Sequence, residues 1–135
     1  MAKTATPIFA QSPLIGKASL TSPTPVTSRA NITGTTGLTQ LTPVSVDGKR
    51  LDHLLIVAKG TTVAGLLTLW LYDGTTSTVI DEITIGAQTA STTSPVFKLD
   101  TNYTANGFNM PPTYQLYVSV TVANDLNVYA FTGDY

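Results

Sequence analysis

Apolar residues alternate with polar ones through the middle of the chain, in three segments that we expect to be strands. Every second position is aliphatic in the first two segments, and the third ends in the same way: Leu54, Ile56, Ala58; Leu67, Leu69, Leu71; Ile83, Ile85. Gly60 separates the first two segments, and Asp73-Gly74 separates the second from the third. Alternation with a period of two, bounded by Gly and Asp-Gly, is typical of antiparallel strands with one apolar face. Residues 50–85 are therefore predicted to form an antiparallel meander.

The clearest alternation lies near the carboxyl end of the sequence. Residues 114–122 and residues 126–131 each alternate, and the turn residues 123–125 separate them, which predicts a hairpin. No segment has helical periodicity, and the apolar face of one sheet needs a second layer to cover it. The predicted fold class is all-β, an antiparallel β-sandwich of jelly-roll type formed by residues 26–135.

Weaker patterns fill the rest of this domain. Two short strands are expected around the turn marked by Gly34 and Gly37, and another over residues 95–100. Residues 101–112 are rich in Asn, Gly and Pro and are expected to be a loop.

Residues 1–25 are predicted to be an extended N-terminal arm. Proline recurs too often for a helix or a central strand, at Pro7, Pro13, Pro23 and Pro25. The segment is nevertheless too apolar for a simple flexible tail because of Ile8, Phe9, Leu14, Ile15 and Leu20. We expect the arm to lie on its own domain or on a neighbouring chain, and a disordered tail is the remaining alternative.

The surface is expected to be polar with few charges. Apolar residues make up 42% of the chain and charged residues only 11%, well below the usual quarter. A surface with so few charges has little repulsion between copies and suits a chain that lies against other proteins. Seven basic residues face eight acidic ones without a basic run, so no nucleic-acid partner is expected. Neither a membrane helix nor a signal peptide is recognisable, which predicts synthesis in a cytoplasm and no membrane partner.

Few residues are candidates for catalysis or metal binding, and these residues lack partners at the spacings that such sites require. Cysteine is absent, and His53 is the only histidine, without a nucleophile at a recognisable spacing. Asp81 and Glu82 are adjacent, so in a strand they face opposite sides and cannot act as a pair. Residues 100–107 resemble part of a calcium loop but lack the acidic residue that ends one. We therefore predict no catalytic residue, no metal site, no cofactor and no enzymatic activity.

Aromatic residues lie out of phase with the aliphatic faces of the predicted strands. Trp70 and Tyr72 alternate with Leu69 and Leu71, and further aromatic residues do the same in their strands: Tyr117, Tyr129, Phe131. Such residues can form a second apolar layer under a covering segment, bind a protein partner, or stack on sugar rings. The sequence leaves these three alternatives open.

Three pieces of the sequence together resemble a known group of proteins: residues 48–62, GKRLDHLLIVAKGTT; residues 65–74, GLLTLWLYDG; and residues 127–135, NVYAFTGDY. They are similar to small virion structural proteins of tailed bacteriophages, which look like capsid decoration or cement proteins. The resemblance covers roughly the last two-thirds of the chain.

The resemblance implies a protein that binds the outer capsid surface, with the major capsid protein and copies of itself as partners. Cement proteins typically sit as homotrimers at three-fold positions, so a location on the virion is expected. The residues expected at subunit or capsid interfaces are apolar and aromatic: Ile8, Phe9, Leu14, Ile15, Leu20, Trp70, Tyr72, Tyr129, Phe131. The alternative function is a glycan- or receptor-binding module of a phage fibre, which requires Trp70 or Tyr72 to be exposed in a groove.

Overall fold

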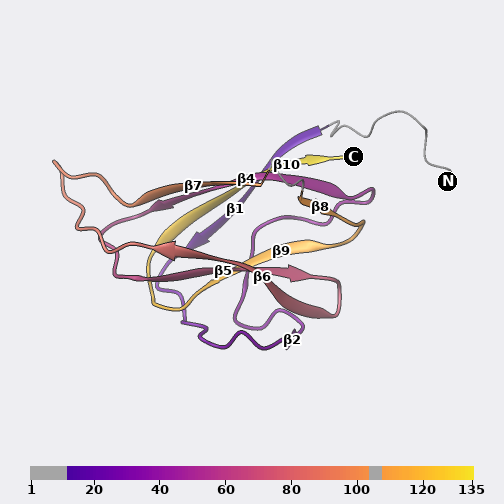
Figure 1. Cartoon of the computed structure of the whole chain (residues 1–135), viewed down its shortest axis with the longest axis horizontal. Coiled ribbons are helices and arrows are strands. Elements are labelled where there is room, and N and C mark those ends of the chain that lie inside the picture. The colour runs from indigo at the N-terminus through magenta and orange to yellow at the C-terminus, as the bar shows by residue number, and fades with distance from the viewer. Residues whose placement is uncertain (1–11, 104–107) are drawn as a thin grey trace.

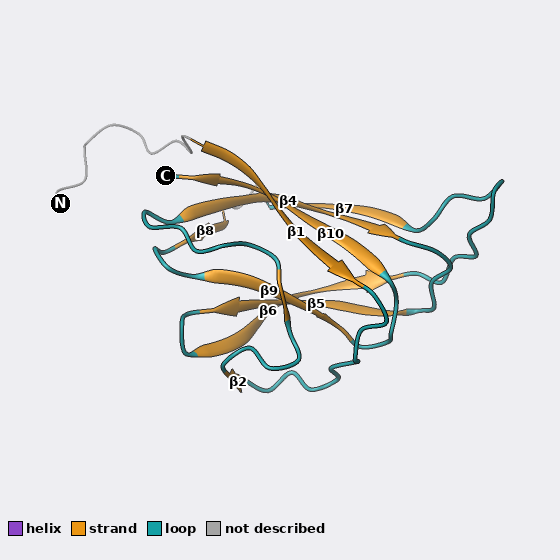
Figure 2. Ribbon diagram, turned by 180° about the vertical axis from the view of Figure 1, so that it is seen from behind, coloured by secondary structure: helices purple, strands orange, loops and turns teal. Residues whose placement is uncertain are grey.

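The chain folds into two antiparallel β-sheets that pack face to face. The computed structural model describes residues 12–103 and 108–135, and these residues contain strands and loops but no helix (Figure 2). Sheet A and sheet B form the two layers of a sandwich (Figure 1). The all-β sandwich predicted from the sequence is confirmed.

Each sheet has five strands. Sheet A has the order β1 (Ser12–Leu20), β10 (Leu126–Asp134), β4 (Lys49–Ala58), β7 (Lys98–Asn102), with β8 (Phe108–Met110) also paired with β4. Sheet B has the order β2 (Ile32–Thr33), β6 (Thr76–Ile85), β5 (Gly65–Tyr72), β9 (Gln115–Val120), β3 (Thr39–Gln40). The loop expected over residues 101–112 thus contains the end of β7 and the whole of β8.

The pairing of the eight principal strands is nested. The first strand pairs with the last, β1 with β10, and the next pairs inward are β3 with β9, β4 with β7 and β5 with β6. A long hairpin rolled into two layers gives this arrangement, which is that of a jelly roll. The jelly-roll topology predicted from the strand count is therefore present.

The core lies between the sheets and is made by the alternating aliphatic residues. Leu54 and Ile56 from sheet A meet Leu67 and Leu69 from sheet B, and all four are fully buried. Burial of one such side chain stabilises the fold by about 1.5–3 kcal/mol. The alternation predicted which face of each strand is buried, and the structure confirms it.

Two strand pairings expected from the sequence are wrong. β4 lies in sheet A and β5 in sheet B, so the predicted meander begins only at β5. β9 and β10 also lie in different sheets, so the predicted hairpin does not form. The loops between these strands, residues 59–64 and 121–125, each cross from one sheet to the other. Sheets pack about 10 Å apart, a distance that five or six extended residues readily span.

The N-terminal segment is part of the sandwich from Ser12 onward, rather than an arm that ends at residue 25. β1 pairs with β10 along its whole length, from Ser12 opposite Asp134 to Leu20 opposite Leu126. It therefore lies on its own domain, one of the two alternatives considered for the arm. Pro13 is compatible with a strand here because β1 is an edge strand. Ile8 and Phe9 lie outside the described residues.

Candidate interaction surface

The only histidine is engaged with an aromatic ring. His53 on β4 is opposite Phe131 on β10, and the two rings stack with centroids 4.2 Å apart and an interplanar angle of 17°. Neither serine nor cysteine is opposite His53 in the strand register, where its other neighbour is Asn102. The ring therefore contributes an aromatic surface to sheet A, without a nucleophile beside it.

The adjacent carboxylates are separated as the sequence predicts. Asp81 accepts a hydrogen bond from the Tyr103 hydroxyl, which comes from the chain that follows β7 in sheet A. Glu82 instead accepts from Arg29, with 3.0 Å between Arg29 Nη2 and Glu82 Oε2. Burial and the bond to Asp81 raise the pKa of Tyr103, and the bond from Arg29 lowers that of Glu82. Each carboxylate thus has its own partner, and they do not form a paired-acid site.

A buried lysine closes the sandwich near the chain end. Lys49 is 1% exposed, and its Nζ donates to the Pro43 carbonyl at 2.7 Å and lies 3.8 Å from Asp134 Oδ1. Burial lowers the pKa of Lys49, while the neighbouring carboxylate opposes this shift. Asp134 Oδ1 is buried and has no hydrogen-bond partner among the described atoms. No cluster of three or more metal-binding side chains occurs in the described part of the chain.

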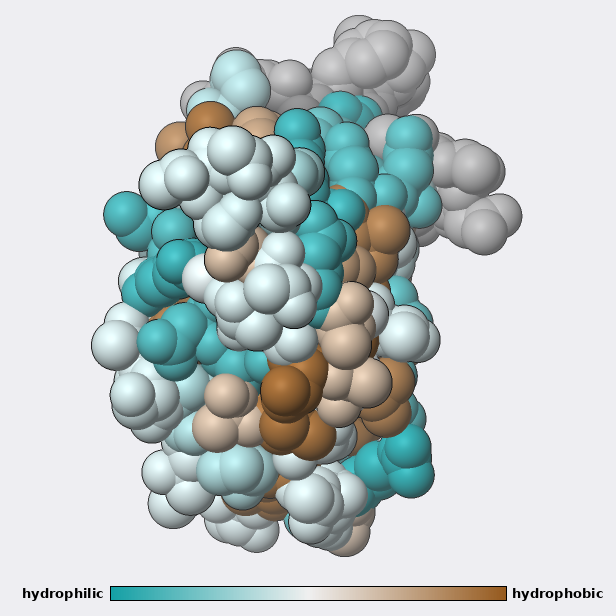
Figure 3. Space-filling view, turned by 90° about the vertical axis from the view of Figure 1, so that its left-hand side faces the viewer, coloured by the Kyte–Doolittle hydropathy of each residue, from teal (hydrophilic) through white to brown (hydrophobic). Residues whose placement is uncertain are grey.

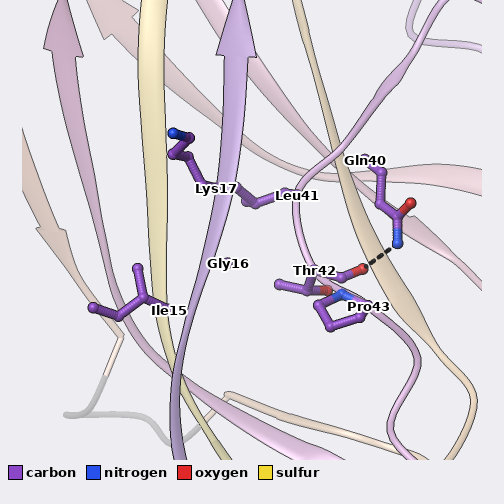
Figure 4. A pocket seen from close by; sticks show the side chains of 7 residues that line it. All are labelled: Ile15, Gly16, Lys17, Gln40, Leu41, Thr42 and Pro43. Carbon is purple, nitrogen blue, oxygen red and sulfur yellow. Dashed lines mark hydrogen bonds between the residues drawn. The ribbon is translucent and has the colours of Figure 1, made fainter.

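An open groove of about 260 Å³ runs between β1 and residues 40–43 (Figure 4). Its polar groups serve the fold: Gln40 Nε2 donates to the Thr42 carbonyl at 3.1 Å, and Thr42 Oγ1 accepts from the Leu116 amide at 3.0 Å. The side chains of Ile15 and Lys17 point away from residues 40–43 (Figure 4). The groove therefore has a backbone floor but no acid or base directed into it.

Trp70 is covered by the chain itself. Residues 26–38, which we call the flap, start at β9, where the Val26 amide donates to the Val120 carbonyl at 2.8 Å. They continue to β6, where β2 pairs with it, and so pass over β5 on the side of sheet B that faces away from sheet A (Figures 1 and 2). Trp70 is 0% exposed beneath this layer, and its Nε1–H donates to Ser119 Oγ at 2.8 Å. A second apolar layer under a covering segment is thus the alternative that applies to Trp70.

The outer face of sheet A has no comparable cover. No described segment crosses it, since the flap and the loops of sheet B lie in the other layer (Figures 1 and 2). The strand registers arrange its side chains in three cross-strand rows: Ile15, Phe131, His53, Asn102; Lys17, Tyr129, Leu55, Asp100; Ser19, Asn127, Val57, Lys98. We call these residues the sheet A grid. Its centre is apolar and aromatic, and Ile15 at its edge is 63% exposed.

The rest of the visible surface is dominated by small polar residues. Figure 3 views the end of the sandwich that carries the loop of residues 86–97, where pale and teal atoms predominate and brown apolar atoms are confined to patches. Residues 91–94 of this loop are all Ser or Thr and are exposed. Such a surface remains hydrated without strong charge, in contrast to the sheet A grid.

The structure brings three of the expected interface residues together. Ile15 and Phe131 are cross-strand neighbours on the outer face, and Tyr129 lies beside them in the next row. Leu14 also lies on β1 and is 41% exposed. Tyr72 lies on sheet B, where its ring meets Tyr117 edge to face at 5.7 Å.

Two other expected interface residues are packed inside the chain. Leu20 is 3% exposed in the core, and Trp70 lies under the flap. Neither side chain is available to a partner in this conformation, because the chain's own core and flap already enclose them. Ile8 and Phe9 lie outside the described residues, as noted above.

Only three of the twelve grid residues, Ile15, Tyr129 and Phe131, are among the residues that the sequence places at an interface. Leu55 and Val57 belong to an uninterrupted apolar run over residues 54–58, and such a run signals a strand with two apolar faces. That signal was available. No comparable signal marks Lys17 and Asp100 in the sequence. They lie in one row only because four strands, β1, β10, β4 and β7, pair in this particular register.

Comparison of the chain with protein-family models, with curated proteins and with solved structures finds no match. The described residues contain no helix of the length and apolar character that crossing a membrane requires.

Proposed function

We propose that this chain is a non-enzymatic structural protein of a bacteriophage virion that decorates the outer capsid surface and stabilises the head. The observation that carries the proposal is the uncovered apolar face of sheet A on a chain with few charges. A half-buried row such as Tyr129 and Leu55 gains free energy when a protein partner removes it from water, at roughly 25 cal/mol per Å² of apolar area. The sequence resemblance to decoration proteins supports the same class of function.

In this proposal the protein acts mechanically. Trimers occupy three-fold positions of the shell, and each makes several weak contacts with capsid protein and with neighbouring copies. Because the contacts of one assembly act together, firm occupancy does not require a strong single site. The proposal includes no catalytic step.

The glycan- or receptor-binding alternative has less support. It relied on Trp70 or Tyr72 in a groove, and Trp70 is enclosed by the flap. Tyr72 remains half-buried beside Tyr117, and its hydroxyl donates to the Gly74 carbonyl at 2.8 Å. The open groove described above is lined by β1 and residues 40–43, and none of these rings lines it.

The proposal is tested by adding the purified chain to empty heads of the phage that encodes it. We expect saturable co-sedimentation with the heads and a higher temperature of head disruption. Ile15→Glu, which places a charge on the apolar face, should reduce occupancy at least tenfold. Val46→Glu is the matched control, because Val46 is 81% exposed in a loop outside the grid. Absence of binding by the unaltered chain would refute the proposal.

A further inference from the structure

The middle row of the sheet A grid has opposite charges at its two ends, and a second lysine, Lys98, lies at the β7 end of the next row. In the middle row Lys17 on β1 is followed by Tyr129 on β10, Leu55 on β4 and Asp100 on β7. Lys17 and Asp100 are both exposed, and neither forms an ion pair within the described chain. One row thus carries a positive end, an apolar centre and a negative end.

We propose that this face pairs with the same face of a second copy of the chain, about a two-fold axis parallel to the strands. Rotation about that axis exchanges the β1 edge with the β7 edge. It places Lys17 of each copy over Asp100 of the other, so two ion pairs flank the contact. A two-fold interface uses the same patch on both copies, and this row is complementary to itself under that operation.

The other simple two-fold arrangement is disfavoured by the same charges. An axis that runs across the strands would leave β1 over β1 and would place Lys17 over Lys17. Like charges brought together across an interface are unfavourable. With the two middle rows in register, the charges at the ends of that row therefore favour the axis parallel to the strands and a second copy as the partner.

The centre of the grid suits sheet-on-sheet packing. The parallel axis lays Tyr129 of one copy over Leu55 of the other, and it brings Phe131 of one copy to the stacked His53 of the other. Aligned sheets pack about 10 Å apart with their strands rotated by about 30°, which these side chains can fill. Sheet B cannot pair in this way, because the flap already occupies its outer face.

The contact is small. Four strands about 4.8 Å apart and five residues of about 3.3 Å give a face on the order of 15 Å in each direction, or roughly 200 Å² per copy, which is well below the roughly 1,000 Å² in total that a specific, stable interface buries. We therefore expect only weak association of the free protein, with dissociation constants on the order of hundreds of micromolar or higher. On a shell, many such contacts act together.

This inference rests on the proposed function only in that the outer face binds protein. Neighbouring three-fold positions of a closed shell are related by two-fold axes, so the pairing would link one trimer to the next. The experiments below use the protein without heads. Their failure is thus separate from a failure to bind capsids.

Absence of cysteine from the sequence allows a clean test with two single variants, Lys17→Cys and Asp100→Cys. Facing sheets pack about 10 Å apart, beyond the roughly 7 Å between Cα atoms that a disulfide allows, so a short bismaleimide reagent is used to join the two thiols. We expect a covalent dimer on a denaturing gel when the two variants are mixed and treated with this reagent. Neither variant alone should give it.

Two outcomes overturn the inference. Cross-linking of Lys17→Cys with itself would show that the strands pair about the other axis. A mixture that cross-links no faster than Lys17→Cys with Thr92→Cys would show that the faces do not meet, because Thr92 lies on an exposed loop away from the grid.

A non-covalent measurement checks the charges directly. Sedimentation equilibrium of the full chain should show self-association that Lys17→Glu weakens on the order of tenfold, since two ion pairs become two repulsions. The double variant Lys17→Glu/Asp100→Lys should restore it. Equal association of the single and double variants would contradict the pairing, and circular dichroism verifies that each variant is folded.

Discussion

A tryptophan on the outer face of a sheet can bind a partner or pack under another segment of its own chain. The exposed fraction of its side chain distinguishes these two roles. Trp70 is fully buried, although it alternates with Leu69 and Leu71 and so points away from the core between the sheets. Its indole N–H donates to Ser119, a buried hydroxyl on the neighbouring strand β9. Trp70 therefore holds the flap to sheet B and is a stability residue.

Replacement of Trp70 by alanine should destabilise the fold strongly. Loss of a buried Trp typically costs about 3–5 kcal/mol through lost burial and the cavity left behind. Urea unfolding followed by circular dichroism measures this, since Trp70 is the only tryptophan and its fluorescence is lost. Ser119→Ala removes the hydrogen bond alone and should cost about 1–3 kcal/mol. An unchanged free energy of unfolding for Trp70→Ala would contradict the packing described.

Gly16 lies where the backbone of another segment leaves no room for a side chain. A Cβ at this position would lie 2.4 Å from the Leu41 carbonyl oxygen, which belongs to the segment that closes the sandwich beside β1. Gly16→Ala should therefore displace β1 and destabilise the chain by about 1–3 kcal/mol. Gly60→Ala is the matched control, because a Cβ there meets nothing within 4 Å. Equal thermal stability of the two variants would rule out the clash.

At the scale of elements, the alternation correctly predicted which face of each strand is buried, but it did not predict which strands pair with each other. The period of two decides which side chains of β4, β5, β9 and β10 are buried. The same burial results whether the next strand lies alongside or in the opposite sheet, so the β4–β5 and β9–β10 connections could not be resolved. β1 was missed for another reason, since Pro13 excludes a central strand but is tolerated at an edge.

The sequence predicted some of the outward-facing residues but not how they are brought together, because that depends on contacts between distant parts of the chain. Ile15, Tyr129 and Phe131 were expected to contact a partner because they are apolar and out of phase with the buried positions. Their meeting on one face depends on β1 pairing with β10, a contact between the two ends of the chain. The flap has few apolar residues and no periodicity, so nothing in its sequence indicated that it covers Trp70.

The flap is fastened by an ion pair, which should make it sensitive to acid. Arg29 in the flap pairs with Glu82 on β6, and the hydrogen bond from Arg29 lowers the pKa of Glu82 from its ordinary value of 4.5. A lowered folded-state pKa gives stability that is present above pH 4.5 and is lost as the pH falls through the folded value. Acrylamide quenching of Trp70 fluorescence should therefore increase below pH 4.5.

The variant Arg29→Ala supplies the control for this prediction. It should raise quenching at pH 7 and reduce the further increase at low pH, because the ion pair that titrates is already absent. The same acid response in Arg29→Ala and in the unaltered chain would assign the effect to other carboxylates. Asp73 is the first of these to consider, since backbone amides of Thr76 and Thr75 also lower its pKa.

At the scale of the whole molecule, the two sheets differ in what lies outside them. The flap covers sheet B, while no segment of residues 12–103 and 108–135 crosses the outer face of sheet A (Figures 1 and 2). With a formal net charge of −1, the chain has little long-range repulsion to oppose contact between copies. The jelly roll thus has one side covered by its own chain and one side that the described residues leave open, which is the side on which the proposed contacts depend.

Removal of β1 tests whether the N-terminal segment is required for the stability of the sandwich. A chain that begins at Thr21 lacks β1, so β10 loses its partner over nine residues and the core loses Ala18 and Leu20. We expect this chain to aggregate or to unfold at a much lower temperature, because β10 becomes an unprotected edge. A chain that begins at Ser12 keeps all ten strands and is the control. Light scattering and thermal unfolding distinguish them, and equal behaviour would mean that β1 is dispensable, as expected of an arm.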